Sequence, residues 1–69
     1  MYERSLSNTT HTRRLTIRSS GQSGWEVVYE QDSEVLKKVR YSDWHRVERA
    51  RAVFALEAGR LCEDGWVDA

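Results

Sequence analysis

The stretch DWHRVERARAVFALEAGRLCEDGW, residues 43–66, decides the fold because it encodes one amphipathic helix and marks where that helix ends. At about 100° per residue, its apolar side chains fall on one face. These are Trp44, Val47, Ala50, Phe54, Ala58 and Leu61. Gly65 and Trp66 then suit the C′ and C″ positions of a Schellman motif, in which Trp66 contacts Leu61. We therefore predict a helix over residues 43–64 whose apolar face covers a sheet.

Three shorter stretches before the helix alternate apolar and polar side chains, which is the period of a half-buried strand. Their apolar residues are Leu15 and Ile17, then Trp25, Val27 and Tyr29, and then Val35, Val39 and Tyr41. Loop-forming residues separate them at 19–24 and 31–33, and Ser42 suits the N-cap of the helix that follows. The order predicts an α+β fold, a three-stranded antiparallel meander with one C-terminal amphipathic helix on one face (βββα), as a single domain over residues 13–69.

The apolar pattern also predicts how the strands pair, because a slip of one residue would turn a strand's whole apolar set to the other face. We expect Ile17 opposite Val27 and Tyr29 opposite Val35, which requires a three-residue turn between the second and third strands. Lys37 then points inward from the edge strand, an arrangement that hinders pairing with another sheet edge. The pattern fixes the face of each strand more firmly than the register of this last hairpin.

Residues 1–12 show no such period. They are rich in Ser, Thr and Asn, and after Met1 they carry only Tyr2 and Leu6 as large apolar groups. A segment of this composition buries little apolar surface and tends to stay disordered. We therefore expect a flexible N-terminal arm over residues 1–12.

Charge is balanced, with 11 Lys and Arg against 11 Asp and Glu. That balance removes the usual electrostatic footprint of a nucleic-acid binder. The sequence has no apolar run near about 20 residues and no charged start followed by an apolar segment, so we expect no membrane span, no secretory signal and a cytoplasmic protein. The single cysteine, Cys62, excludes an intramolecular disulfide and argues against a cysteine-based metal cluster.

No group of residues indicates catalysis. His45 has Glu48 and Arg49 as its i+3 and i+4 neighbours on the face away from the apolar stripe, which is typical of a solvated surface cluster. Cys62 has no charged or histidine neighbour on its stripe that would activate the thiol. No glycine-rich phosphate loop or pair of facing carboxylates can be assembled either. We therefore predict no enzyme activity, no catalytic or metal-binding residues and no cofactor.

The outer face of the predicted sheet is where a nucleic acid would bind. The candidate contacts are Arg14, Arg18, Lys38 and Arg40. In the expected register Glu26 and Glu30 lie between these basic residues, and such cross-strand pairs stabilise a sheet by about 0.2–1 kcal/mol each. We therefore favour a structural role for these charges over phosphate contacts.

The order of three strands and a helix also resembles that of two families. The residues concerned are Trp25-Glu26-Val27 at the second strand, Tyr41-Ser42-Asp43 before the helix, and the alanine-rich run over residues 50–56. This layout, over residues 13–61, resembles the plant AP2 domain and the integrase arm-binding domains. The resemblance implies that basic and aromatic side chains of the sheet enter the major groove of DNA. In this chain Trp25 falls instead on the face predicted to form the core.

A second flank of the helix is apolar enough to contact a partner. Leu56 and Val53 project away from the core stripe beside Ala52 and Gly59, small residues that allow another backbone to approach. Val53 and Leu56 are therefore the candidate protein interface, and a weak homodimer is one assembly they would support. The sequence as a whole predicts a small non-catalytic interaction protein with a protein partner. A nucleic-acid-binding module on the exposed sheet face is the alternative.

Overall fold

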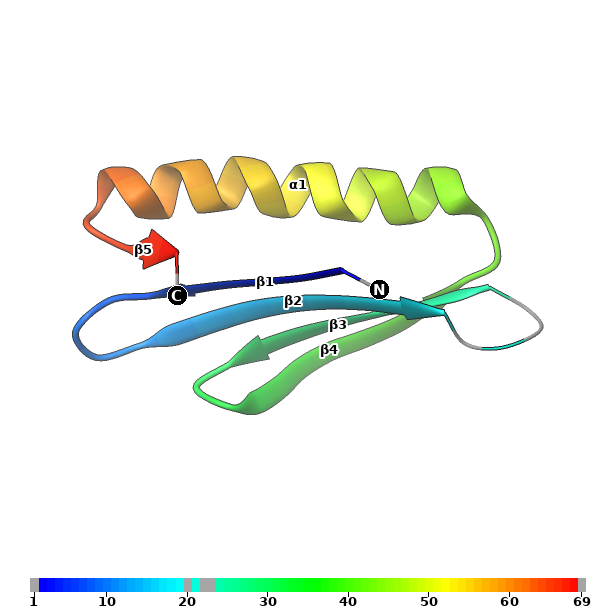
Figure 1. Ribbon diagram of the computed structural model, residues 1–69, viewed down its shortest axis with the longest axis horizontal. Helices are drawn as coiled ribbons and strands as arrows, with labels where there is room; N and C mark the ends of the chain where they lie inside the picture. Colours follow the sequence, from blue (N-terminus) through cyan, green and yellow to red (C-terminus); the bar gives the residue numbers. More distant parts are fainter. Residues whose placement is uncertain (1, 20, 22–23, 69) are drawn as a thin grey trace.

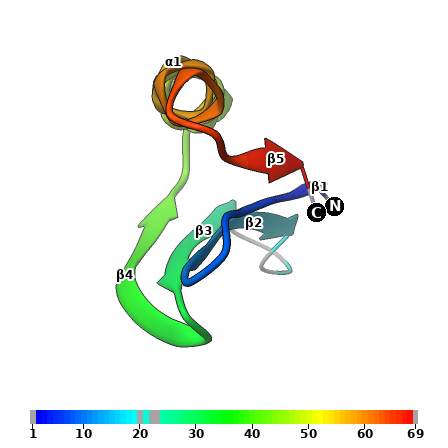
Figure 2. The same cartoon turned by 90° about the vertical axis from the view of Figure 1, so that its left-hand side faces the viewer.

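The computed structural model describes residues 2–19, 21 and 24–68, and in this part of the chain one long helix lies across one antiparallel sheet (Figure 1, Figure 2). The strands are β1 (Tyr2–Ser7), β2 (Thr12–Ser19), β3 (Trp25–Gln31), β4 (Glu34–Tyr41) and β5 (Val67–Asp68), and the helix is α1 (Trp44–Glu63). The strand order across the sheet is β4-β3-β2-β1-β5. The predicted α+β class is confirmed, but the predicted number of three strands is too small.

The first strand, β1, corrects the expectation of a flexible arm over residues 1–12. It pairs with β2 along its whole length in antiparallel register, starting with Tyr2 opposite Ile17. Leu6 is fully buried in the core, and Tyr2 packs against that core. The sequence pattern did not predict this strand, because Arg4 occupies the inward position between Tyr2 and Leu6 and so interrupts the apolar alternation.

The end of α1 confirms the predicted stop signal. Gly65 has a φ of 99°, which glycine adopts without a steric penalty. Its amide donates to the carbonyl of Cys62 at 3.2 Å, and the amide of Trp66 donates to the carbonyl of Leu61 at 3.0 Å. These two bonds define a Schellman motif. The motif turns the chain back toward the sheet.

The chain that leaves this turn forms β5, which extends the sheet beyond β1. Asp68 lies opposite Leu6, and Val67 lies opposite Ser7. The Arg4 guanidinium Nε donates to Asp68 Oδ1 at 3.1 Å, and this hydrogen bond raises the pKa of Arg4. The last strand therefore supplies the partner for the one charged residue on the inward side of β1.

The helix begins one residue later than predicted, because Asp43 and not Ser42 is the N-cap. Asp43 has extended backbone angles, φ −115° and ψ 122°, and its carboxylate accepts the amide of His45 at 3.0 Å. A carboxylate in this position satisfies one of the amides that lack a partner within the helix, and it also interacts favourably with the helix dipole.

The β3–β4 hairpin differs from the prediction in its register. β2 and β3 pair as expected, with Ile17 opposite Val27. Tyr29, however, lies opposite Lys37 and not opposite Val35. The expected inward position of Lys37 holds, since its ammonium lies 5.8 Å from the centroid of the Tyr29 ring.

The turn of this hairpin explains the shift. Only Asp32 and Ser33 form the turn, with φ values of 54° and 69°, which is the backbone of a two-residue turn of type I′. That turn alone would place Val39 on the face opposite to Val27. A bulge beside Tyr29, where β4 uses one residue more than β3, restores the two valines to one face.

The core lies between α1 and the strands β1, β2 and β3. Its buried apolar residues are Leu6, Leu15, Ile17, Val27, Val47, Ala50, Phe54 and Ala58. The predicted helix stripe is confirmed at its centre, and Leu61 is partly buried at its end. Trp44, which also belongs to the predicted stripe, is not buried, since 40% of its surface is exposed. Its ring packs against Trp25, with 5.2 Å between centroids, and its indole N–H donates to Glu48 at 2.6 Å.

The edge strand β4 curves away from the helix over much of its length (Figure 2). Within it only Val39 and Tyr41 are partly buried, and all other residues are exposed. Val35, predicted to lie on the inner face, is 56% exposed, and Leu36 beside it is 62% exposed. One side of the molecule therefore has a gap between helix and sheet that side chains of both elements line.

Candidate interaction surface

A hollow of about 390 Å³ lies between α1 and the two strands nearest the open edge of the sheet. Its lining residues are Tyr29 of β3, Tyr41 of β4, and Arg46, Arg49, Ala50 and Val53 of α1. We refer to the hollow formed by these residues as the α1–β4 groove. The four helix residues follow the spacing i, i+3, i+4 and i+7, which places them on one flank of a helix.

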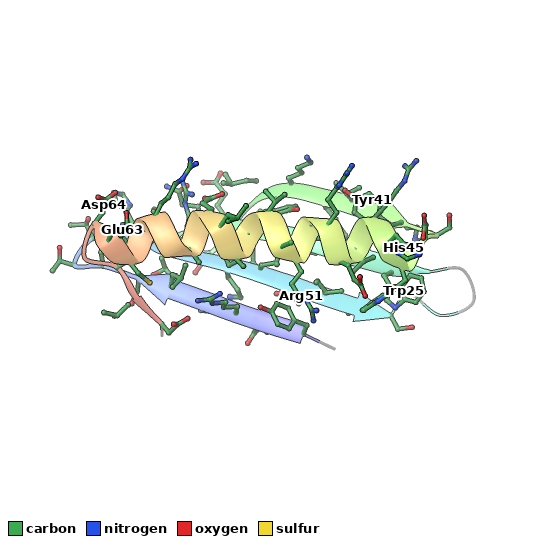
Figure 3. The ribbon with its side chains drawn as sticks, turned by 90° about the horizontal axis from the view of Figure 1, so that it is seen from above. Trp25, Tyr41, His45, Arg51, Glu63 and Asp64 are labelled. Atoms are coloured by element: carbon green, nitrogen blue, oxygen red, sulfur yellow. The ribbon has the colours of Figure 1, made fainter. Side chains whose placement is uncertain are left out.

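The groove lies on only one flank of the helix. Tyr41 is beside one flank of α1, whereas Arg51 projects from the other (Figure 3). The guanidinium of Arg51 lies 5.5 Å from the centroid of the Tyr2 ring. Arg51, which the helix period places among the core residues, therefore covers an aromatic ring and is separate from the groove.

The charge in the groove has one sign. Its lining includes Arg46 and Arg49 and no carboxylate. The ammonium of Lys37 adds a positive charge nearby, because it lies over the ring of Tyr29, which lines the groove. Within the described part of the chain, neither of these arginines takes part in an ion pair. Because the protein as a whole is neutral, this is a local concentration of positive charge.

Tyr29 adds a neutral hydroxyl group to this positive site. Burial, with a smaller effect of nearby Tyr41, raises the pKa of Tyr29. The phenol of Tyr29 is therefore protonated at neutral pH and can donate a hydrogen bond. Arginine N–H groups and a tyrosine O–H together suit an anionic oxygen, such as that of a carboxylate.

Two further hollows continue the groove along the same flank. One, of about 260 Å³, shares Tyr29 with the groove and reaches Leu36 of β4. The other, of about 480 Å³, shares Val53 and extends to Leu56. Arg13 and Glu57 line both, and they form an ion pair that joins β2 to α1. The flank is thus a continuous uneven surface.

Exposed apolar residues border this surface on both sides. On the helix side, Val53 is 55% exposed and Leu56 is 72% exposed. On the sheet side lies exposed Leu36 of β4, and this strand has no neighbouring strand on its outer edge among the described residues. Val53 and Leu56, the interface candidates from the sequence, therefore lie in solvent on the side where helix and edge strand diverge.

The sequence pattern does not single out the residues at the centre of the groove. It places Arg49 beside His45 on the solvated face of the helix and Tyr41 on the core face of the sheet. The available signal was the spacing of Arg46, Arg49 and Val53, which marks a mixed basic and apolar flank beside the core stripe. The part played by Tyr29 could not be inferred, because it depends on how far β4 curves away.

The nucleic-acid candidates lie together on the opposite, outer face of the sheet, but carboxylates are interspersed among them. Arg14 is 3.7 Å from Glu3, and Lys38 is 3.7 Å from Glu26. Glu26 also lies directly opposite Arg18 on one side and Arg40 on the other. The register with Tyr29 opposite Val35 would place Lys38 opposite Glu26. In the structure Lys38 lies opposite Val28 and reaches Glu26 diagonally. Two of the four candidates, Arg14 and Lys38, thus form ion pairs within the sheet, and Arg18 and Arg40 have Glu26 as a cross-strand neighbour.

Other chemistry has little support in the described residues. His45 and Cys62 are both exposed, and they lie at opposite ends of α1. Among residues 2–19, 21 and 24–68, no group of three or more His, Cys, Asp or Glu side chains could hold a metal ion. In the same part of the chain, α1 is too polar to cross a membrane.

Comparison of the chain with known proteins gave no match to a family model, to a curated protein or to a solved structure. The resemblance in layout to the plant AP2 domain and the integrase arm-binding domains also fails on strand number, because β1 and β5 extend the sheet.

Proposed function

We propose that this protein is a small non-catalytic interaction protein that binds a protein partner through the α1–β4 groove and the apolar residues beside it. The observation that carries the proposal is the coincidence, on one flank, of a basic and aromatic hollow, exposed Val53 and Leu56, and a sheet edge that is unpaired among the described residues. Arginine and tyrosine are the residue types that most often dominate binding energy at protein interfaces.

The shape of the flank supports a polypeptide as the partner. The hollow is bounded by a helix on one side and a strand edge on the other, so a bound segment would contact both side chains and unpaired backbone groups. Addition of a strand to an exposed sheet edge is a recurrent mode of peptide recognition. The outer face of the sheet is a weaker candidate, because its arginines and lysines already have carboxylate neighbours.

A selection experiment tests this proposal. Random peptides as long as the eight-residue strand β4 are displayed and selected on the immobilised wild-type protein. We expect enrichment that Val53→Lys removes, because a lysine at the groove wall would block the apolar contact. The matched control is Ala52→Lys, which lies on the other flank near Tyr2.

Both substitutions are at exposed helix positions, where stability usually changes by less than about 0.5 kcal/mol. Thermal melts of the two variants verify that each remains folded. Peptides that bind the Val53→Lys and Ala52→Lys variants equally well, or no enrichment at all on the wild type, would contradict the proposal.

A further inference from the structure

We infer that the partner segment is an extended acidic peptide, which adds to the outer edge of β4 and directs a carboxylate to Arg46 and Arg49. This inference rests on the proposed function and specifies its ligand class. It draws on three observations: the sign of the charge in the groove, the charge along β4, and the place where β4 is regular enough to pair.

The first observation is the one-signed lining of the groove. Arg46 and Arg49 are one helical turn apart on the same flank, and neither takes part in an ion pair within the described residues. Two unpaired arginines beside the neutral hydroxyl of Tyr29 make the site attractive to an anion and repulsive to a cation. An incoming carboxylate satisfies this arrangement.

The second observation is the charge of the edge strand itself. β4 carries Lys37, Lys38 and Arg40 against Glu34 alone, and the Glu26 that neighbours Lys38 and Arg40 belongs to β3 and offsets only part of this charge. Two copies of this strand would therefore bring basic side chains opposite one another, and like charges facing across a strand pair are destabilising. A second copy of the protein is thus a poor occupant of the edge, whereas an acidic strand is a complementary one.

The third observation is the position of the bulge. β4 departs from regular pairing with β3 beside Tyr29, and it pairs regularly from Lys37 to Tyr41. A bulged stretch is a poor template for another strand, while a regular stretch presents its free backbone groups in order. The regular part of β4 ends at the groove, because Tyr41 lines it.

The geometry of a strand then predicts the peptide pattern. Successive side chains of a strand point to opposite faces, so every second residue of an added strand faces α1. We expect acidic residues at alternate positions facing Arg46 and Arg49. Small or apolar residues near them would contact Val53. Proline should be absent, since it removes a backbone donor.

The test uses the peptides selected on the wild-type protein and the protein variants Arg46→Glu, Arg49→Glu and Arg51→Glu. Labelled peptides are titrated against each variant and followed by fluorescence anisotropy. We expect Asp and Glu at alternate positions of the selected peptides, and a loss of affinity of about tenfold for Arg46→Glu and for Arg49→Glu. Arg51→Glu makes the same charge change on the other flank and should bind almost as tightly as the wild type.

Three results would overturn the inference. If the selected peptides were neutral or basic and their binding still required Val53, the proposed function would stand but the ligand would not be acidic. An equal loss of peptide affinity in Arg51→Glu would show that binding depends on the overall charge of the protein and not on a site at Arg46 and Arg49. A random single-stranded oligonucleotide that displaces the peptide, and that binds more tightly than it through Arg46 and Arg49, would assign the groove to nucleic acid.

Discussion

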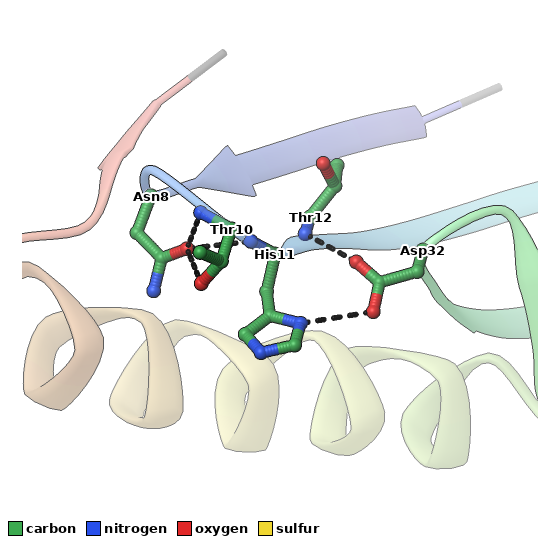
Figure 4. A network of polar contacts seen from close by, with 5 residues as sticks. All are labelled: Asn8, Thr10, His11, Thr12 and Asp32. Atoms are coloured by element: carbon green, nitrogen blue, oxygen red, sulfur yellow. Dashed lines mark hydrogen bonds and ion pairs between the residues drawn. The ribbon is translucent and has the colours of Figure 1, made fainter.

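The carboxylate of Asp32 connects two turns at one end of the sheet, since its Oδ2 lies 3.0 Å from Nδ1 of His11 (Figure 4). Its Oδ1 accepts the amide of Thr12 at 2.9 Å. Asp32 belongs to the β3–β4 turn and His11 to the turn between β1 and β2, where Asn8 Oδ1 accepts the amides of Thr10 and of His11. Asp32 therefore links the turn of the β3–β4 hairpin to the β1–β2 turn, in addition to the pairing of β3 with β2.

This contact predicts a dependence of stability on pH. The hydrogen bond from His11, with that from the Thr12 amide, lowers the pKa of Asp32 below its ordinary value. A carboxylate with a lowered pKa stabilises the fold above its unfolded pKa of about 3.9, and that stabilisation is lost as the pH falls through the folded pKa.

Asp32→Asn keeps a residue that tolerates the positive φ and removes the carboxylate. We expect its urea midpoint to lie below that of the wild type at neutral pH. The difference should shrink as the pH falls below the unfolded pKa of about 3.9, and it should disappear once Asp32 is protonated in the folded protein as well. Midpoints measured over this range provide the check, and a difference that does not vary with pH would exclude the ionised carboxylate as its cause.

Leu6→Ala tests whether β1 belongs to the core. Leu6 is fully buried, so its truncation should cost about 2–5 kcal/mol. Thr9→Ala, in the exposed turn that follows, is the control and should be nearly neutral. Thermal unfolding of both variants gives the comparison. If Leu6→Ala left the melting midpoint unchanged, residues 2–7 would be an arm, as the sequence alone led us to expect.

Phe54→Ala tests how α1 docks on the sheet. Phe54 is 4% exposed at the centre of the helix stripe, and its truncation should cost about 3–5 kcal/mol. A protein of 69 residues has a stability of roughly 3–10 kcal/mol, so this loss is a large part of its free energy of unfolding. Thermal unfolding followed by circular dichroism measures the loss, and an unchanged melting midpoint would show that the helix faces the sheet in another orientation.

Gly24→Ala and Gly59→Ala should act in opposite directions. Gly24 has a φ of 128°, and a Cβ there would overlap the carbonyl oxygen of Tyr41, so alanine should cost at least about 1–3 kcal/mol. Gly59 lies inside α1 with open space around it, and alanine should add about 1 kcal/mol. Denaturant midpoints of the two variants, compared with that of the wild type, measure both changes in stability. Equal effects would mean that the close approach of Gly24 to Tyr41 is not maintained in solution.

Helix α1 could be predicted from the sequence because its signals are local and repeated. The apolar stripe recurs through Phe54 at helical spacing, and Gly65 with Trp66 marks its end in two adjacent residues. The outer strands could not be predicted in the same way. β1 has Arg4 at an inward position, and its partner Asp68 is distant in sequence.

The register of the β3–β4 hairpin and the groove could not be predicted from neighbouring residues in the sequence, for a different reason. Asp32 and Ser33 adopt positive φ without a glycine, so the turn gave no glycine signal. The bulge beside Tyr29 returns Val39 to the face of Val27, so it depends on how β4 pairs with β3 beyond the turn. The candidate interface at Val53 and Leu56 followed from helix period alone, whereas Tyr29 and Tyr41 join it only through the curvature of β4.

The most direct test of the central claim is the site of peptide binding on the folded protein. A selected peptide is titrated into isotope-labelled wild-type protein, and the amide shifts are followed by nuclear magnetic resonance. We predict that the largest changes fall in β4 from Lys37 to Tyr41 and around Arg46, Arg49 and Val53 of α1. Changes centred on the outer sheet face, at Arg14 and Arg18, would contradict the account.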